Sequence, residues 1–206
     1  MKLLELRKLG WLLAAVGLLA ALPVSALAQG VKNSINLAIG FVPPIGDTDG
    51  TIGMVEYERL ITRTLSVYGR GSILNYKFDD GTDEEDGKGT GVGLGVRFFP
   101  QGGLKGFYVG GGIGHYRSKW DYKDDKGTSF ATAGNGKTSS IQWGGEVGYR
   151  FNLGSERVSL TPAFNAGSWL GADTTCNQTY PTSQTCTKEG EAGFYAAISL
   201  ALGIAF

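Results

Sequence analysis

Residues 194–206 read FYAAISLALGIAF, and their pattern is the clearest indication of the fold. Every second side chain is apolar and mostly bulky: Phe194, Ala196, Ile198, Leu200, Leu202, Ile204 and Phe206. The positions between them are mostly small: Tyr195, Ala197, Ser199, Ala201, Gly203 and Ala205. A period of two predicts a strand, because successive side chains of a strand point to opposite faces. A bulky apolar face suits contact with lipid and a small face suits a narrow interior, as in a transmembrane β-barrel.

The other end of the chain is typical of an exported protein. It has a basic start, an apolar run and a small-residue site: Lys2, Arg7 and Lys8, then residues 12–22, then Ala26-Leu27-Ala28. We therefore predict a signal peptide at residues 1–28 and one domain at residues 29–206. The alternative is an uncleaved anchor, but the run is short for a span of about 20 residues.

Seven further alternating segments precede the closing strand, so eight strands are expected. They are residues 34–41, 51–60, 65–76, 90–99, 106–120, 138–151 and 158–170. The connections after the second, fourth and sixth strands are short. Those after the third, fifth and seventh are long and polar: residues 77–89, 121–137 and 171–189. Short turns on one side and long loops on the other are the pattern of an outer-membrane barrel.

This pattern predicts an all-β fold, an eight-stranded antiparallel up-and-down transmembrane β-barrel. It also predicts two aromatic girdles, formed by Phe99, Phe107, Phe151 and Phe206 at the periplasmic interface and by Phe41, Trp120, Trp169 and Phe194 at the outer one. An open sheet edge within lipid would leave backbone groups unpaired, which favours closure.

In pattern, topology, leader and terminal Phe206, the chain resembles the OmpA and OmpX type of small bacterial outer-membrane barrel. The resemblance implies a location in the outer membrane. It also implies that Phe206 is a signal for the barrel assembly machinery, and that outer-membrane lipids and lipopolysaccharide are partners. It carries over no functional residue, because no family-specific functional motif is present.

Composition agrees with a barrel and excludes some partners. The mean hydropathy is -0.06, as expected when strands alternate, and 34 of 206 residues are Gly. A net charge of +0 argues against nucleic acid held by bulk electrostatics. No cofactor is expected, because the glycine-rich stretches lack the context of a nucleotide-binding loop.

Six charged residues fall on the inward rows of the expected strands: Glu56, Glu58, Arg70, Arg97, Glu146 and Arg150. An eight-stranded barrel is just wide enough to be filled by its own side chains. The simpler interpretation is an ion-pair network that fills the lumen, since buried charges need partners. The functional alternative is a polar path for small solutes.

Catalytic residues are scarce. His115 falls on the outward row, whereas the nearby Ser118 falls on the opposite face and Asp121 lies further along. A lipid A-modifying enzyme would need a serine, a histidine and an acid within reach of one another. We instead expect His115, Arg117 and Lys119 to lie at headgroup level and meet lipopolysaccharide phosphates.

The long loops carry the remaining candidates. Cys176 and Cys186 are close in sequence and should form a disulfide after export. The acidic run at residues 79–86 is either a solvated loop tip or a weak divalent-cation site, and no metal is assigned.

Taken together, the sequence predicts a non-enzymatic outer-membrane barrel whose exposed loops serve envelope integrity, adhesion or ligand binding. The alternatives are a narrow channel for small or hydrophobic solutes and a lipid A-modifying enzyme.

Overall fold

The structure, a computed structural model, describes residues 32–42, 48–129, 131–154, 157–181, 184–190 and 193–206. The regular secondary structure of these residues consists of strands only. They are β1 (Asn33–Val42), β2 (Thr48–Leu60), β3 (Leu65–Asp79), β4 (Glu84–Phe98), β5 (Gly106–Asp124), β6 (Thr132–Asn152), β7 (Val158–Tyr180), β8 (Gln184–Gly190) and β9 (Phe194–Ala205). The predicted signal peptide lies outside the described residues. Within them, no helix is long and apolar enough to cross a membrane.

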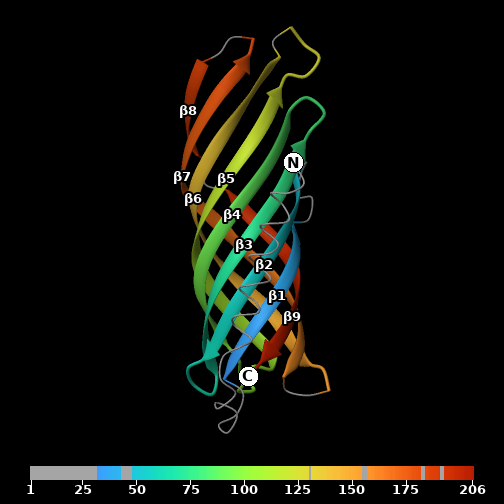
Figure 1. The fold of residues 1–206 in the computed structure, drawn as a ribbon, viewed down its shortest axis with the longest axis vertical. Coiled ribbons are helices and arrows are strands. Elements are labelled where there is room, and N and C mark those ends of the chain that lie inside the picture. Colours follow the sequence, from blue (N-terminus) through green and yellow to red (C-terminus); the bar gives the residue numbers. More distant parts are fainter. Residues whose placement is uncertain (1–31, 43–47, 130, 155–156, 182–183, 191–192) are drawn as a thin grey trace, which may run out of the picture. The chain divides into compact units, whose positions relative to one another are not determined.

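Eight of the strands close into a barrel (Figure 1). β1 to β7 pair in chain order, every pair antiparallel, and β9 closes the ring by pairing with both β1 and β7. This confirms the predicted eight-stranded antiparallel barrel. Within the described part of the chain, β8 pairs with β7 alone and is a ninth strand that the sequence did not predict.

The strands are longer than predicted, so three expected loops were wrong. β3, β4, β5, β6 and β7 extend well into residues 77–89, 121–137 and 171–189, which leaves short connections at their ends. The outward face of the extension is polar, and its inward row mixes polar side chains with aromatic ones such as Trp120 and Tyr122, so it lacks a bulky apolar outward row. It remains a strand because the backbone ladder continues between neighbours, as in the pairing of Asp86 with Asp121 and of Asp121 with Asn135.

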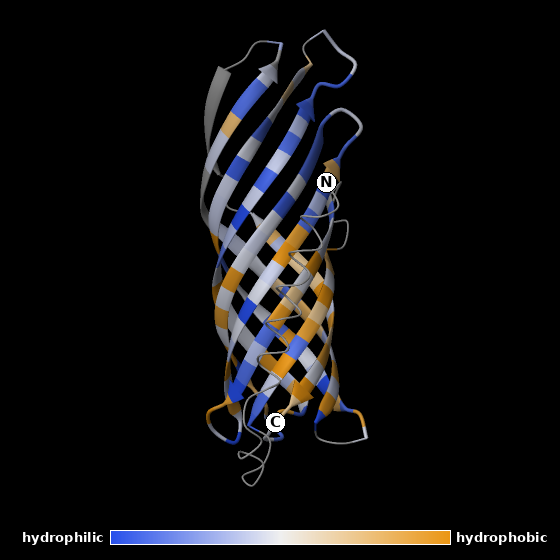
Figure 2. Ribbon diagram, viewed as in Figure 1, coloured by the Kyte–Doolittle hydropathy of each residue, from blue (hydrophilic) through white to orange (hydrophobic). Residues whose placement is uncertain are grey.

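The outward apolar side chains form a band around one half of the barrel, and the other half is polar (Figure 2). Leu94, Val92 and Ile204 are more than 60% exposed, as is Phe194. On the inward rows, Ser34, Asn36, Ser66 and other small polar residues are buried instead. An apolar surface of this extent outside a polar interior reverses the pattern of a water-soluble barrel.

Part of the predicted aromatic girdles was wrong. Phe99 is fully buried and packs against Tyr108, with ring centroids 5.2 Å apart, just beyond the end of β4 at Phe98. Trp120 donates from its indole to Thr138 on the inward row, at 2.9 Å. Trp169 packs against two inward tyrosines, Tyr116 and Tyr195. Their positions along the strands suggested that they lie at the membrane interfaces. Alternation of side chains along each strand instead directs these three rings to the inside of the barrel.

Candidate functional site: the charged lumen

The six predicted lumen residues meet in one network in the half of the barrel nearer the short turns. Glu56 and Glu58 lie on β2, Arg70 on β3, Arg97 on β4, and Glu146 and Arg150 on β6. Five of them are buried, and the side chain of Arg70 is only 19% exposed. Three carboxylates and three guanidinium groups balance in charge, as a low-dielectric interior requires.

Arg97 is the centre of the network. Its guanidinium pairs with all three carboxylates: with Glu56 (Nη2 to Oε2, 2.8 Å), with Glu58 (Nη1 to Oε2, 3.1 Å) and with Glu146. The contact with Glu56 is bidentate, which is the geometry that a planar guanidinium favours. One cation therefore joins strands on opposite sides of the lumen.

The other two arginines complete the pairing. Arg70 lies between two carboxylates, 3.0 Å from Glu56 and 2.9 Å from Glu146. Arg150 pairs with Glu58 on the side nearer the short turns. Some donors nevertheless lack a partner, because Nε of Arg70 and both Nε and Nη1 of Arg150 are buried without a hydrogen bond.

Neutral side chains satisfy remaining carboxylate oxygens. Asn36 donates to Glu56 at 3.0 Å, and Ser66 donates to Glu58 at 2.6 Å. Both come from inward rows of neighbouring strands. The carboxylates are thus held by hydrogen bonds as well as charge, which fixes their positions.

Aromatic rings surround the arginines. The guanidinium groups of Arg70 and Arg97 each lie 4.3 Å from the centroid of the Tyr68 ring. Arg97 also lies over Tyr108, and Arg150 lies 5.4 Å from the centroid of Phe99. Cation–π contacts of this kind strengthen when the cation is desolvated.

An apolar cluster, the apolar floor, lies at the short-turn end of the barrel, next to the charges. Phe99, Leu104 and Tyr108 are buried together, with Leu60 and Ala163 packed against them. The sequence pattern did not predict this floor, because Phe99 was assigned to the periplasmic aromatic girdle. The turn residues that follow it bring Leu104 back under the barrel.

Two small cavities flank the network. One of about 70 Å³ lies toward the polar half and is lined by Tyr116, Gln142 and Tyr195 among others. The other, of about 30 Å³, is lined by Asn36, Arg97 and Arg150 among others. Arg70 and Glu146 line both, so their ion pair stands between the two spaces. Cavities of this size hold water molecules.

The structure does not bring His115, Ser118 and an acidic residue together, as a lipid A-modifying enzyme would need. His115 contacts Ser139 Oγ at 3.0 Å, a partner from β6 that sequence analysis did not consider. No carboxylate in the described part of the chain bonds to this imidazole. Ser118 lies on the inward side, as predicted from its parity.

Two carboxylates of the acidic run, Asp79 and Glu84, pair with lysines. Asp79 bonds to Lys126, and Glu84 lies near Lys77, Lys123 and Lys126. Among the described residues, no group of three or more His, Cys, Asp or Glu could hold a metal ion.

The two cysteines face each other in the β7–β8 register, and Cys176 is buried. This register agrees with the predicted disulfide, which stays a prediction here. The side chain of Cys186 lies outside the described residues.

Comparisons with known proteins point to the fold. No family model matches the chain, and no curated protein matches it by sequence. A major outer membrane protein from Thermus thermophilus is similar in structure, with 15% identity, a TM-score of 0.57, and coverage of 86% of this chain and 100% of that one. The outer membrane protein OprG from Pseudomonas aeruginosa is similar at 13% identity, with a TM-score of 0.55 and coverage of 85% and 96%. At these identities the likeness is one of fold.

Proposed function

We propose that this chain, which shares the fold of the small eight-stranded outer-membrane barrels, is an integral bacterial outer-membrane protein without enzymatic activity. Its lumen is closed, and its polar extension on the outer side serves envelope integrity, adhesion or the binding of a ligand. The assembly machinery would recognise the closing strand with Phe206. The partners at the membrane would be outer-membrane lipids and lipopolysaccharide.

One observation carries the proposal: an apolar band surrounds a barrel whose interior holds six charged side chains. In water the band would be a large exposed apolar surface, whereas in a bilayer it faces hydrocarbon. The charged interior closes the lumen, so the accessible polar surface is the outer wall and rim of the extension. Function is therefore expected there.

The experiment is expression in a Gram-negative host, followed by separation of inner and outer membranes. The chain should be found in the outer membrane, and its folded form should migrate differently on a gel before and after boiling. A matched variant, Phe206→Ala, should accumulate outside the membrane if the terminal ring is read during assembly. Recovery of the wild-type chain in the soluble fraction would overturn the proposal.

The second candidate is a narrow channel, favoured by the two cavities on either side of the Arg70–Glu146 pair. Arg70 and Glu146 line both cavities, so a channel would need at least this ion pair to open. The apolar floor of Phe99, Leu104 and Tyr108 would still separate them from the short-turn end. A conducting state therefore needs two rearrangements, which is why the closed barrel is the first proposal.

A further inference from the structure

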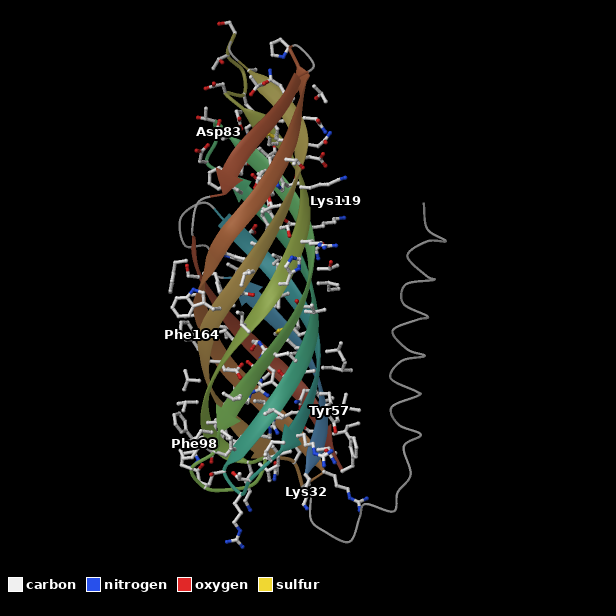
Figure 3. All side chains as sticks on the ribbon, turned by 90° about the vertical axis from the view of Figure 1, so that its left-hand side faces the viewer. Lys32, Tyr57, Asp83, Phe98, Lys119 and Phe164 are labelled. Atoms are coloured by element: carbon white, nitrogen blue, oxygen red, sulfur yellow. The ribbon has the colours of Figure 1, made fainter. Side chains whose placement is uncertain are left out.

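A row of lysines crosses the outer wall just above the apolar band. In the strand register, Lys88 of β4 lies directly opposite Lys119 of β5, and Lys119 lies directly opposite Lys137 of β6. All three are exposed, and Lys119 points away from the wall (Figure 3). Arg117, also exposed, lies on the same face two residues from Lys119. We call these four residues the cation row.

The positive charges of the cation row repel one another. Side chains directly opposite on neighbouring strands are about 5 Å apart at Cβ, and like charges in such positions destabilise a sheet. Within the described part of the chain, none of the four residues takes part in an ion pair, whereas Lys77, Lys123 and Lys126 do. A ligand that supplies negative charge would remove the repulsion.

The height of the row points to the membrane surface. Along β4 and β5, the pairs on the same face below Lys88 and Lys119 are Thr90 with Arg117 and Val92 with His115, and then Leu94 with Ile113 in the apolar band. Four residues of strand separate Lys119 from His115, which is about 13 Å along the strand and less along the barrel axis. Charged groups of lipid headgroups lie at this level.

The positive charge of the cation row is confined to the outer surface of β4, β5 and β6. In the same register row, the neighbours further round the barrel are uncharged: Asn75 and Thr51 on one side, Thr175 on the other. Asp86 and Asp121 form the next row on the side away from the apolar band. Asp173 of β7 is the register partner of Ser139, at the β7 edge of the row that contains Arg117. Along β4 and β5, a phosphate group approaching from the membrane therefore meets cations before Asp86 and Asp121.

Resting on the proposed location in the outer membrane, we propose that Lys88, Arg117, Lys119 and Lys137 form a binding site on β4, β5 and β6 for the phosphate groups of an outer-leaflet glycolipid. Ammonium and guanidinium groups spread over three strands can contact more than one phosphate. The acyl chains of the same molecule would lie along the apolar residues below, such as Ile113 and Trp143. The occupant is a lipid because the cations and the apolar wall are continuous.

The test compares triple variants in nanodiscs of phosphatidylcholine that contain a small fraction of lipid A. The first, K88Q/K119Q/K137Q, removes the three lysines of the cation row and leaves Arg117. The second, K88R/K119R/K137R, keeps its charge. The matched control, R59Q/R63Q/K105Q, removes three exposed cations near the short turns at the other end of the barrel. Lipid A that stays bound after extraction into mild detergent is measured by mass spectrometry.

The wild type, the arginine variant and the control should retain lipid A with both phosphates. The glutamine variant should retain at least about tenfold less, since each cation near an anionic surface contributes to binding. Dephosphorylated lipid A should be retained equally and weakly by all four proteins. In detergent without lipid A, the glutamine variant should unfold at a higher temperature than the wild type, because the repulsion is gone.

If the glutamine variant retained as much lipid A as the control, the proposed binding site would be wrong. Full displacement of bound lipid A by soluble inositol hexakisphosphate would show a site for soluble polyanions and would also overturn it. Heat-modifiable gel mobility in every variant would show that each barrel is folded. A loss of lipid binding could then be distinguished from a failure of the proposed function. If the wild type itself does not insert into the nanodisc, the outer-membrane location is at fault.

Discussion

Arg97 of β4 and Glu146 of β6 form an ion pair inside the barrel, although β5 lies between their strands. The register places Gly110 of β5 directly between them, opposite Arg97 on one side and Glu146 on the other. A Cβ on Gly110 would lie 2.7 Å from the carbonyl oxygen of Val96 and 2.9 Å from Glu146 Oε1. The pair therefore depends on a residue without a side chain.

Gly110→Ala should destabilise the barrel by about 1–3 kcal/mol, because the added methyl group cannot be accommodated without moving backbone. Gly145→Ala is the matched control on β6, since its Cβ would meet nothing nearer than 3.6 Å. Urea unfolding in lipid vesicles, followed by tryptophan fluorescence, measures both. Equal effects of the two variants would contradict this account of Gly110.

Arg97→Met should cost about 3–5 kcal/mol of unfolding free energy, because it leaves Glu56, Glu58 and Glu146 with too little positive charge. The same unfolding experiment measures it. Arg59→Met, which removes an exposed cation from β2, should change stability by less than about 0.5 kcal/mol. A loss below about 1 kcal/mol for Arg97→Met would show that the network contributes little to stability.

The refolded protein should not conduct ions in a planar bilayer. Arg70→Ala removes the pair between the two cavities, yet it should also remain silent because Phe99 and Tyr108 still close the short-turn end. Opening is expected only when Arg70→Ala is combined with Phe99→Ala. Discrete conductance of the wild type that changes with Arg70→Ala would make transport the leading function.

The contact between the β3–β4 and β5–β6 connections should weaken in acid. The main-chain N–H of Gly81 and then Lys126 lower the pKa of Asp79 below its ordinary 3.8. A lowered pKa means that the stabilisation is present above that ordinary value and is lost as the pH falls through the lowered one. Asp79 in turn raises the pKa of Lys126 above 10.5, so the contact should persist until alkaline pH.

The heteronuclear NOE of the Lys126 amide, which donates to the Thr82 carbonyl, reports this contact. Its value should fall as the pH is lowered from neutral through the lowered pKa of Asp79, and should already be low at neutral pH in Asp79→Asn. Asp121→Asn, an exposed change on the β5 wall, is the control. No change in acid would contradict the role of Asp79.

The paired positions of Cys176 and Cys186 predict a disulfide in the exported protein. Alkylation without reductant should add no label, and alkylation after reduction should label both thiols. The barrel should stay folded after reduction, because β7 pairs with β9 over Val158–Ser168, well below the bridge. Loss of heat-modifiable mobility on reduction would show that the hairpin is needed for the barrel.

Alternation along each strand was enough to predict the face of the charged lumen residues and of the bulky apolar row in the closing strand. Alternation has a period of two whatever the neighbouring strand is, so Glu56, Arg97 and Glu146 could be assigned to the interior one strand at a time. The contrast between bulky and small rows at residues 194–206 similarly fixed the apolar outside. Closure followed from the need to pair every backbone group in lipid.

How far the strands continue, and which charges meet, depend on the tertiary structure. The outward face of the extension is polar and lacks a bulky apolar row, so its strands, and β8 above all, depend on pairing with neighbours that sequence patterns do not reveal. The aromatic partners of Trp169, Tyr116 and Tyr195, likewise come from other strands. The pairing of Arg97 with Glu146 and the alignment of Lys88, Lys119 and Lys137 both arise from the stagger between strands, a property of the closed barrel and of no single segment.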